Sequence, residues 1–283
     1  MQTQTKLEIT PIASALGAEI KGANLADDHA PELIQDIRQA LLDNCVIFFR
    51  DQELTPDQLV RFAKKFGSLD EHDFIHGMPD YPEVLRLVKE ADEGGYNFGG
   101  GWHTDVSYME KPSLGSLLYA VDIPLIGGDT LFANQYLAYE TLTDAMKEML
   151  DGLNCIHSAL GIFDPKGVAR DHFKNMNMNP NNKAEEEVAH PVVRTHPETG
   201  RKSLYVNVNF CKRLQGMTNE ESQPILKFLF EHGRREIFTC RFQWKKGSVA
   251  FWDNRCVQHH ALNDYQGHRR EMYRVTISGD RPI

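Results

Sequence analysis

The sequence contains no C-x-x-C pair and no long apolar run, and both absences narrow the classes of protein to consider. Its five cysteines are odd in number and widely spaced: Cys45, Cys155, Cys211, Cys240 and Cys256. Such spacing argues against a disulfide framework and against a cysteine-rich zinc site. The first residues, MQTQTKLEIT, lack an apolar signal core, and no run approaches the ~18 apolar residues of a membrane span. We therefore expect a soluble protein of the reducing cytoplasm, with no membrane partner.

An excess of basic residues is also missing. Lys and Arg number 31 against 40 Asp and Glu, which gives a net charge of -9. Because nucleic-acid binding depends on Lys and Arg that neutralise phosphates, we expect no nucleic-acid partner. An anionic ligand must instead be held by a local basic pocket. With 283 residues, 41% of them hydrophobic, the chain can bury a substantial core, and we expect a single domain over residues 1–283.

The apolar patterns predict helices near the start of the chain and mostly strands after it. Helical spacing predicts a helix over 31–44, a buried strand follows over 45–49, and Thr55-Pro56 begins a second helix that ends near Gly67. Further strands are expected at 82–88, 102–108, 114–123 and 129–133, and further helices at 136–151 and 218–232. Many short strands with turn signals predict an α+β, mainly β fold: a double-stranded β-helix (jelly roll, cupin-like) with peripheral helices.

Residues 164–188 differ from the rest of the chain. They are polar, rich in Asn and without a regular apolar period. Long insertions in compact domains are often lids or binding loops, so this segment is expected to be a surface insertion or a lid.

The stretch GGGWHTDVSY, from Gly99 to Tyr108, does not continue as a phosphate loop would, because no Gly-Lys-Ser/Thr follows the glycines. Its aromatic and β-branched residues predict a strand over 102–108, in which side chains two positions apart share a face. His103 and Asp105 would then stand side by side. An imidazole beside a carboxylate can begin a metal site, although one such pair also arises by chance in a chain of this composition.

The last predicted strand alternates strictly, so that Arg270, Met272, Arg274 and Thr276 share one face. At ~3.3 Å per residue the two arginines lie ~13 Å apart. If that face lines the interior, the two cations need anionic partners. The strand face carries no acid of its own, so the partners are either acids from other strands or small-molecule anions. The fork of an arginine matches a carboxylate or a sulfonate.

These residues belong to motifs that resemble the taurine dioxygenase family of iron- and 2-oxoglutarate-dependent oxygenases nearly from end to end. The motifs are LEITPIASALGAEIKGANL, NCVIFFRDQELTPDQLVRFAKKFGSL, WHTDVSY, GGDTLFANQYLAYETL, HPVVRTHPETGRKSLYVN and WDNRCVQHHALNDY followed by HRREMYRVTISGD. The resemblance implies that His103, Asp105 and His259 bind Fe(II) as a facial triad, with three positions left open. His260 is the neighbouring alternative, but the family pattern places the ligand directly after Gln258.

The resemblance also implies the binding groups for the other reactants. The far carboxylate of 2-oxoglutarate would be held by Arg270 and Thr130, and O2 would be the third reactant. The substrate-binding residues would be His72, Arg274, Phe163, Phe210 and Gly99. The expected reaction is hydroxylation of a small organic anion, taurine or a related organosulfonate, followed by release of sulfite and an aldehyde. We also expect a homo-oligomer, a dimer or a tetramer.

Two positions depart from the pattern of the taurine enzymes. Gly99 stands where they have an asparagine near the substrate amine, and Ile75 stands where they have a tyrosine. A larger sulfonate, an alkyl sulfate ester or an aryloxyalkanoate is therefore an alternative substrate. Two other classes of function also stay open: a metallohydrolase with zinc on the same three ligands, and a noncatalytic jelly-roll binding protein.

Overall fold

The computed structural model describes residues 7–167, 173 and 175–283 of the chain. Its largest layer is an eight-stranded sheet in the order β1-β2-β3-β14-β6-β16-β4, in which β5 also pairs with β16. The strands are β1 (Glu8–Pro11), β2 (Ala18–Lys21), β3 (Val46–Phe49), β4 (Leu69–Asp70), β5 (Leu85–Lys89), β6 (Gly115–Asp122), β14 (Val249–Asp253) and β16 (Arg270–Ile277). Only β2 and β3 pair in parallel within this sheet of the described chain.

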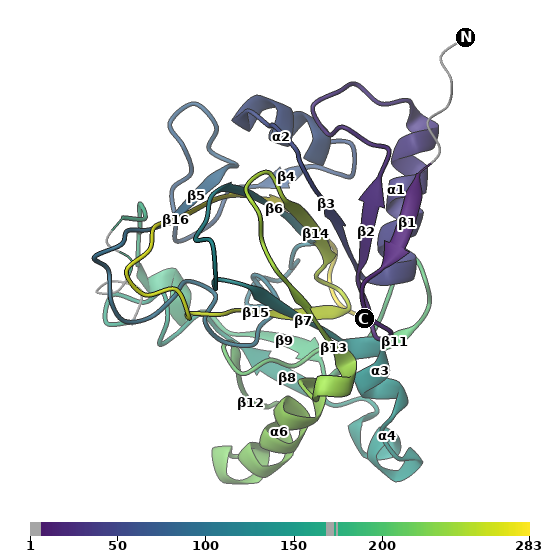
Figure 1. Ribbon diagram of the computed structural model, residues 1–283. Helices are drawn as coiled ribbons and strands as arrows, with labels where there is room; N and C mark the ends of the chain where they lie inside the picture. The colour runs from purple at the N-terminus through teal and green to yellow at the C-terminus, as the bar shows by residue number, and fades with distance from the viewer. Residues whose placement is uncertain (1–6, 168–172, 174) are drawn as a thin grey trace.

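Smaller antiparallel sheets lie below this layer in Figure 1. One has the order β13-β7-β15, a second has the order β12-β8-β9, and a third consists of β10 and β11. Their strands are β7 (Thr130–Asn134), β8 (Asn154–His157), β9 (Val188–Pro191), β10 (Val193–Thr195), β11 (Lys202–Leu204), β12 (Cys211–Leu214), β13 (Thr239–Phe242) and β15 (Val257–Ala261). The main sheet and the β13-β7-β15 sheet together form the predicted jelly roll.

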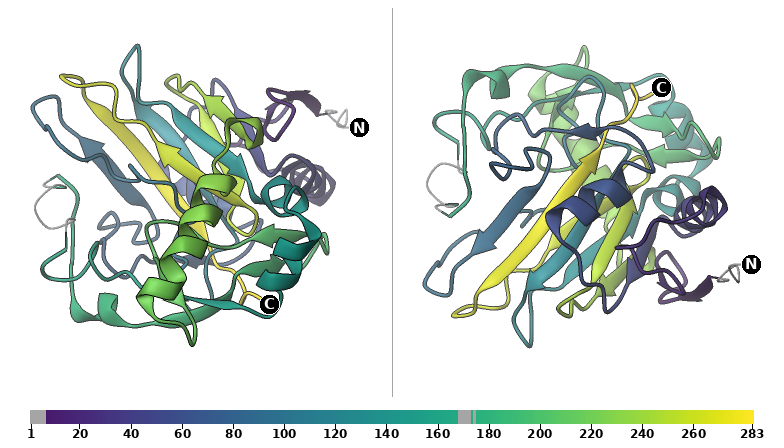
Figure 2. Two further views of the ribbon diagram at one scale, coloured as in Figure 1. Left: turned by 90° about the horizontal axis from the view of Figure 1, so that it is seen from below. Right: turned by 90° about the horizontal axis from the view of Figure 1, so that it is seen from above.

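The helices lie around the sheets rather than between them. They are α1 (Pro31–Asn44), α2 (Pro56–Ala63), α3 (Gln135–Glu140), α4 (Asp144–Leu150) and α6 (Asn219–Gly233), with short 3-10 helices at Asn182–Glu185 and Glu236–Phe238. Figure 2 shows α2 lying across the outer face of the main sheet. Among the described residues, no helix has the length and apolar character needed to cross a bilayer.

Strand β3 shows how the sequence builds the layers. Its residues alternate, so Ile47 and Phe49 join the apolar cluster under α1 and α2, while Val46 and Phe48 join the cluster between the sheets. Phe48 stacks on Phe242 of β13 with ring centroids 3.9 Å apart. A strand that is buried on both faces in this way is apolar throughout, as the sequence indicated.

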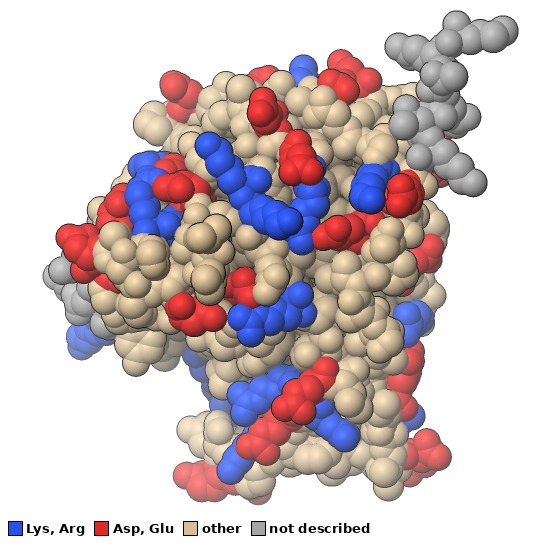
Figure 3. Space-filling model, in the orientation of Figure 1, with Lys and Arg blue, Asp and Glu red and all other residues tan. Residues whose placement is uncertain are grey.

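Charged side chains of both signs are interspersed on the face drawn in Figure 3. Ion pairs at the surface of the protein include Arg201 with Glu140 and Arg213 with Glu187. This face therefore offers no continuous basic surface.

Three expected elements differ from the observed ones. The helix predicted over 136–151 is broken into α3 and α4, because the hydroxyl of Thr143 accepts a hydrogen bond from the Met146 amide and begins a new helix. Helix α2 ends at Ala63 rather than near Gly67, where tighter bonds such as Lys65 N to Phe62 O replace the α-helical ones.

The strand predicted over 102–108 is wrong. Only His103 forms a bridge, to His259, and residues 105–108 turn, with Val106 at a φ of 45°. The Asp105 amide bonds to the side chain of Asn254 instead of to a neighbouring strand. A contact from a distant part of the chain thus overrides the β propensity of the run.

Candidate active site

The site begins where the glycine-rich segment 99–101 meets β15. The amide of His103 donates to the His259 carbonyl at 3.1 Å, and the His259 amide donates back at 2.8 Å. At Gly101 a Cβ would lie 2.5 Å from the side-chain oxygen of Asn209, so a larger residue there would displace the Asn209 side chain. Two backbone hydrogen bonds therefore place two histidines from distant parts of the chain beside each other.

The structure brings together the three side chains expected to bind iron. Asp105 Oδ1 lies 3.6 Å from His103 Nε2 and 3.8 Å from His259 Nε2. The two imidazole centroids are 4.2 Å apart, and all three residues are buried. The turn at Asp105, and not a strand, is what directs its carboxylate between the histidines.

The charges of these groups suit a divalent cation. Burial alone would raise the pKa of Asp105, but the Arg274 guanidinium and the two histidines outweigh it and hold this pKa well below its usual range. Burial, with the neighbouring His103, lowers the pKa of His259 well below its ordinary value. An ionised carboxylate with a neutral imidazole is the form in which such side chains bind metal ions.

Hydrogen bonds leave the expected ligand atoms available. His103 Nδ1 lies 2.7 Å from the Gly101 carbonyl, so Nδ1 carries the proton and Nε2 keeps its lone pair. The ring of His259 packs against Trp252, with centroids 4.7 Å apart, and its buried Nδ1 has no protein partner among the described residues. The donor set therefore fits Fe(II), which two histidines and one carboxylate bind on one face.

A polar network fixes the second oxygen of Asp105. Ser116 on β6 donates to Asp105 Oδ2 at 2.8 Å, and Asn254 donates in turn to Ser116 at 3.1 Å. Trp252 Nε1 donates to the Asn254 side-chain oxygen at 2.9 Å. Ser116 and Asn254 have no exposed surface, so the orientation of the carboxylate is set within the core.

Arg270 is a buried cation without a carboxylate beside it. Its Nε and Nη2 have no hydrogen-bond partner within the described part of the chain. The guanidinium lies between two rings, 6.0 Å from the Trp244 centroid and 5.9 Å from that of Tyr265. Desolvation lowers the pKa of Arg270. Trp244 Nε1 donates to the Thr130 hydroxyl at 3.0 Å, so the two residues expected to bind 2-oxoglutarate share one neighbour.

Arg274, four residues further along β16, is paired within the protein. Its Nη1 donates to Asp105 Oδ1 at 3.0 Å, and its guanidinium carbon lies 5.8 Å from the Phe98 ring. The two arginines of β16 thus differ: Arg274 pairs with an acid from another segment, and Arg270 forms no ion pair with any residue that the structure describes.

His72 lies near Arg274 as a neutral group. Its Nδ1 accepts from the Phe74 amide at 3.1 Å, which leaves the proton on Nε2, 3.4 Å from the Tyr108 hydroxyl. Burial, assisted by the Arg274 charge, lowers the pKa of His72 to about 3. His72 can therefore donate a hydrogen bond to a ligand without carrying a charge.

A cavity opens over these groups and holds about 870 Å³ of empty space, its open mouth included. Phe163 and Phe210, both expected in the pocket, line it together with Gly99, His72 and Arg274. Phe210 lies 6.3 Å from His103 between ring centroids.

The two positions that depart from the pattern of the taurine enzymes lie differently. Gly99 borders the cavity, but a Cβ there would meet His103 and Ala261 at 3.5 and 3.6 Å, and its φ is +77°. The missing side chain therefore reflects a backbone requirement as well as room for a ligand. Ile75 is buried in the core and does not line the cavity.

His260 does not belong to the metal-ligand group of the described residues, and its ring centroid lies 5.7 Å from that of Trp102. Residues that the sequence did not single out also border the cavity: Tyr96, Phe98, Tyr108, Ile162, Phe173 and Asn209. Phe173 belongs to the expected lid, of which residues 168–172 and 174 lie outside the described residues. These wall residues come from separate loops, so no local pattern marks them.

Comparison with known proteins gives a consistent result. Residues 8–276 match the family described as "Taurine catabolism dioxygenase TauD, TfdA family". The chain is 35% identical to an alpha-ketoglutarate-dependent sulfate ester dioxygenase of Pseudomonas putida, over 98% of this chain and 91% of the relative. It is 30% identical to an alpha-ketoglutarate-dependent sulfonate dioxygenase of Saccharomyces cerevisiae, over 98% and 68%. A crystal structure of a putative alpha-ketoglutarate-dependent taurine dioxygenase from Burkholderia xenovorans superposes with a TM-score of 0.83 at 38% identity, over 98% and 94%.

Proposed function

The chain belongs to the TauD/TfdA family of Fe(II)- and 2-oxoglutarate-dependent dioxygenases, and from this premise we propose that it oxidises an organosulfonate that carries an apolar chain. The enzyme class follows from the family. The substrate is our proposal, and the lining of the cavity carries it: one buried cation and one neutral histidine face a wall that is otherwise mainly apolar.

The role proposed for Arg270 is to bind the far carboxylate of 2-oxoglutarate. A buried guanidinium with unpartnered nitrogens is costly unless an anion completes its hydrogen bonds. A carboxylate matches the guanidinium fork, and the bond would be charge-assisted. The Thr130 hydroxyl, which accepts from Trp244, can donate its own proton to the same carboxylate.

His103, Asp105 and His259 would hold Fe(II), which supplies the position where O2 and the 2-oxo acid react to oxidise a substrate C–H bond. The protein's task is then to hold the reactants. Ser116 hydrogen-bonds to Asp105 Oδ2 and so would leave Oδ1 for the ion, and the Gly101 carbonyl, by holding the proton on His103 Nδ1, would leave Nε2 available as a ligand.

Arg274 and His72 are proposed to bind the sulfonate. Arg274 would supply the charge and His72 an Nε2 proton, so the two donors can serve different sulfonate oxygens. In the ligand-free protein, Arg274 donates to Asp105 Oδ1. A bound sulfonate would accept hydrogen bonds from Arg274 in place of Asp105. Asp105 Oδ1 would then be more available as a ligand to the metal.

The cavity suits an apolar chain better than the ammonium group of taurine. Asp105 is the only carboxylate among the lining residues that the structure describes, and it already faces two histidines and Arg274. The amide of Asn97 is occupied, because its nitrogen donates to the Leu262 carbonyl and its oxygen accepts from Tyr265. Asn209 is the other amide among the described lining residues, so most of the cavity would desolvate an ammonium group without pairing it.

The proposed reaction is balanced as follows. R-CH2-SO3⁻, O2 and 2-oxoglutarate give R-CH(OH)-SO3⁻, succinate and CO2. The hydroxylated sulfonate then loses bisulfite as its hydroxyl proton leaves, and the aldehyde R-CHO remains.

An alkyl sulfate ester is the second candidate, supported by the 35% identity to a sulfate ester dioxygenase. Its products would be an aldehyde and sulfate.

A product assay separates the two candidates. Purified enzyme with Fe(II), ascorbate and 2-oxoglutarate would be given hexanesulfonate, hexyl sulfate, taurine or 2,4-dichlorophenoxyacetate, with succinate, sulfite and sulfate measured. The proposal predicts one sulfite per succinate from hexanesulfonate at the highest kcat/KM of the set. Sulfate from hexyl sulfate at a higher kcat/KM would favour the second candidate, and turnover of the aryloxy acid alone would refute both.

Oligomeric state and domain organisation remain separate proposals. We propose a homo-oligomer and a single domain spanning the chain, and light scattering with limited proteolysis tests both. A monomer, or a stable proteolytic fragment that retains the metal site, would contradict them.

A further inference from the structure

A second group of metal-binding side chains lies outside the proposed active site, on the β12-β8-β9 sheet. Cys155 and His157 are two positions apart on β8 and so share one face. Cys211 on β12 stands opposite His157, and His190 on β9 stands opposite Cys155. Residues directly opposite in antiparallel strands project to the same side of a sheet. Strand pairing therefore gathers two thiols and two imidazoles that the sequence keeps far apart.

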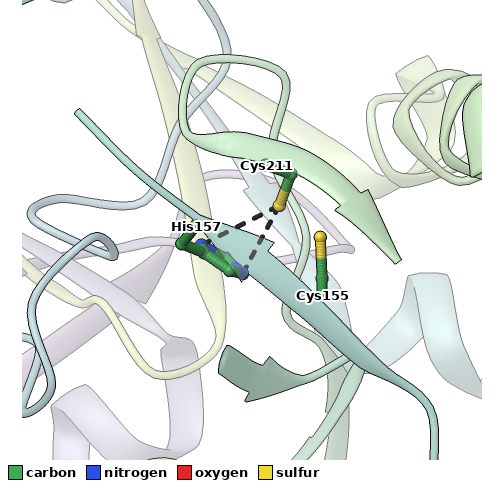
Figure 4. A group of neighbouring side chains, drawn as sticks. All are labelled: Cys155, His157 and Cys211. Carbon is green, nitrogen blue, oxygen red and sulfur yellow. Dashed lines mark hydrogen bonds between the residues drawn. The ribbon is translucent and has the colours of Figure 1, made fainter. Parts of the chain in front are cut away.

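Three of these groups are already close enough to share an ion. One donor atom each from Cys155, His157 and Cys211 lies within 4.8 Å of the others, and Cys211 Sγ is 3.4 Å from His157 Nε2. In a tetrahedral zinc site, bonds of ~2.3 Å to sulfur and ~2.1 Å to nitrogen put ligand atoms ~3.6 Å apart. Figure 4 shows the two sulfur atoms facing each other beside the His157 ring.

The surroundings complete the pattern of a metal site. His157 Nδ1 lies 3.1 Å from the Ser107 hydroxyl, a contact that fixes the ring while Nε2 faces Cys211. The backbone amide of Asn207 donates to Cys211 Sγ at 3.2 Å, as amides do to metal-bound thiolates.

His190 provides the observation that ordinary core packing leaves unexplained. Its Nε2 donates to the Met109 carbonyl at 2.9 Å, so Nδ1 carries the lone pair. This Nδ1 has no hydrogen-bond partner among the described residues, and water cannot supply one from outside because the side chain has no exposed surface. The His190 and His157 ring centroids are 5.2 Å apart. A buried acceptor without a donor is costly, and a cation beside it would remove the cost.

From this geometry we propose that Cys155, His157 and Cys211 bind a thiolate-preferring divalent ion such as Zn²⁺, with His190 as the fourth ligand. Binding displaces one proton from each thiol, so two thiolates, two neutral imidazoles and one dication form a site without net charge. A neutral site is the form that a buried, largely apolar environment tolerates. The wide spacing of the cysteines in the sequence argued against a zinc site. That argument, however, covers only ligands that lie close together in the chain.

The position of the ion indicates a structural role. Cys211 directly follows Phe210, which lines the active-site cavity, and the Phe210 carbonyl accepts from the Ser158 amide next to His157. An ion held by β8, β9 and β12 would therefore fix one wall of that cavity. It would take no part in the oxidation itself.

Cobalt titration tests the proposal, because Co²⁺ bound to thiolate has a strong near-ultraviolet charge-transfer band that histidine and carboxylate ligands cannot produce. The full chain, reduced and freed of metal, would be titrated with CoCl2. The proposal predicts a thiolate band that saturates at one equivalent, is removed by ZnCl2, and persists in Asp105→Ala, which impairs only the other site. It also predicts loss of the band in Cys155→Ala and Cys211→Ala.

Cys240→Ala is the matched control, since Cys240 is a buried thiol outside the group. This variant should keep the band. If the folded wild-type chain develops no thiolate band, the proposal is refuted whatever the variants do. A band that survives in both Cys155→Ala and Cys211→Ala would refute it as well, because other thiols would then be the ligands.

Discussion

The two oxygens of Asp105 have different partners, and this difference predicts different effects for its neighbours. Oδ1 faces both histidines and Arg274, whereas Oδ2 accepts a hydrogen bond from Ser116. Removing a ligand should abolish Fe(II)-dependent turnover, so we expect His103→Ala and Asp105→Ala to be folded and inactive. Succinate release and circular dichroism are the measurements. Full activity of either variant would refute the assigned metal ligands.

The adjacent histidines of β15 provide a matched pair for the third ligand. His259 belongs to the metal-ligand group, whereas His260 contacts Trp102. His259→Ala should therefore lose metal binding and turnover, and His260→Ala should keep most of both. Titration with Mn(II), followed by the signal of the free ion, reports binding independently of catalysis. The opposite ranking would show that His260 is the ligand.

Ser116 is expected to position Asp105 for the metal. Groups that hydrogen-bond to metal ligands typically contribute ~10–100-fold in metal affinity. We expect Ser116→Ala to weaken Mn(II) binding by a factor in that range, because Asp105 Oδ2 loses its donor. Ser113→Ala is the control, since Ser113 also accepts from Asn254 but does not touch Asp105. Equal affinity losses in both variants would indicate a general effect on the core instead.

At this scale the sequence indicated the chemistry of the site but not its arrangement. His103, Asp105 and His259 could be named from the resemblance, and the structure brings them together. Ser116 and Asn254 could not be named, because their importance depends on hydrogen bonds between residues 138 positions apart. No local pattern records such a contact.

At the scale of elements, β16 holds two arginines whose surroundings differ. Arg270 lacks a partner for two of its nitrogens among the described residues, while Arg274 is bonded to Asp105. We expect Arg270→Ala to raise the KM for 2-oxoglutarate ~100-fold or more, because losing a partner of a buried charge costs ~3–5 kcal/mol. Arg274→Ala should instead raise the KM for the sulfonate and keep the slow decarboxylation of 2-oxoglutarate without substrate. Loss of 2-oxoglutarate affinity alone in both variants would contradict this division.

The connection between β14 and β15 contains a buried ion pair that predicts how stability depends on pH. Asp253 binds Arg255 through both oxygens, at 2.8 and 2.6 Å, and His196 at 3.0 Å. Burial alone would raise the pKa of Asp253, but the Arg255 and His196 contacts outweigh it and lower this pKa. The unfolded chain therefore binds a proton on Asp253 more readily than the folded protein does. The stability contributed by Asp253 is present above the unfolded pKa of ~3.9 and is lost as pH falls below it.

Asp253→Asn should accordingly lower the free energy of unfolding by ~3–5 kcal/mol at pH 7, because Arg255 stays buried with weakened partners. This difference should be unchanged at pH 5 and should shrink below pH ~4, as urea denaturation of both proteins would reveal. Glu187→Gln is the control, because the exposed Glu187–Arg213 pair should contribute only ~0–1 kcal/mol. A difference that already shrinks between pH 7 and 5 would contradict the lowered pKa.

The elements themselves could be predicted where their pattern is local. Helix α1 and the alternation of β16 follow from periodic spacing, and α6 from its capping box. The turn within 102–108 could not be predicted, because the composition of this run favours a strand. The Asp105 amide instead donates to the Asn254 side chain, where a strand would donate to a neighbouring strand. The partners of Arg270 and Arg274 were likewise open, since they depend on loops from other parts of the chain.

At the scale of the whole molecule, the cavity lies between segments that are widely separated in the sequence. The described residues of its walls are 72, 96–101, 103, 105, 106, 108, 162, 163, 173, 209, 210 and 274, so the proposed substrate would be bound by the assembled fold rather than by one element. Fold class and reaction class could be predicted from end-to-end resemblance. The apolar character of the walls could not, because it depends on which side chains of these loops face inward.

The chain-length preference tests the central claim most directly. For alkanesulfonates from ethane- to octanesulfonate and for taurine, kcat/KM would be measured from succinate and sulfite release. Burial of each methylene contributes ~0.8 kcal/mol, so kcat/KM should rise up to ~4-fold per carbon until the cavity is filled, and taurine should be a poorer substrate than hexanesulfonate. Phe163→Ala or Phe210→Ala should flatten this rise. A preference for taurine over every longer alkanesulfonate would contradict the account.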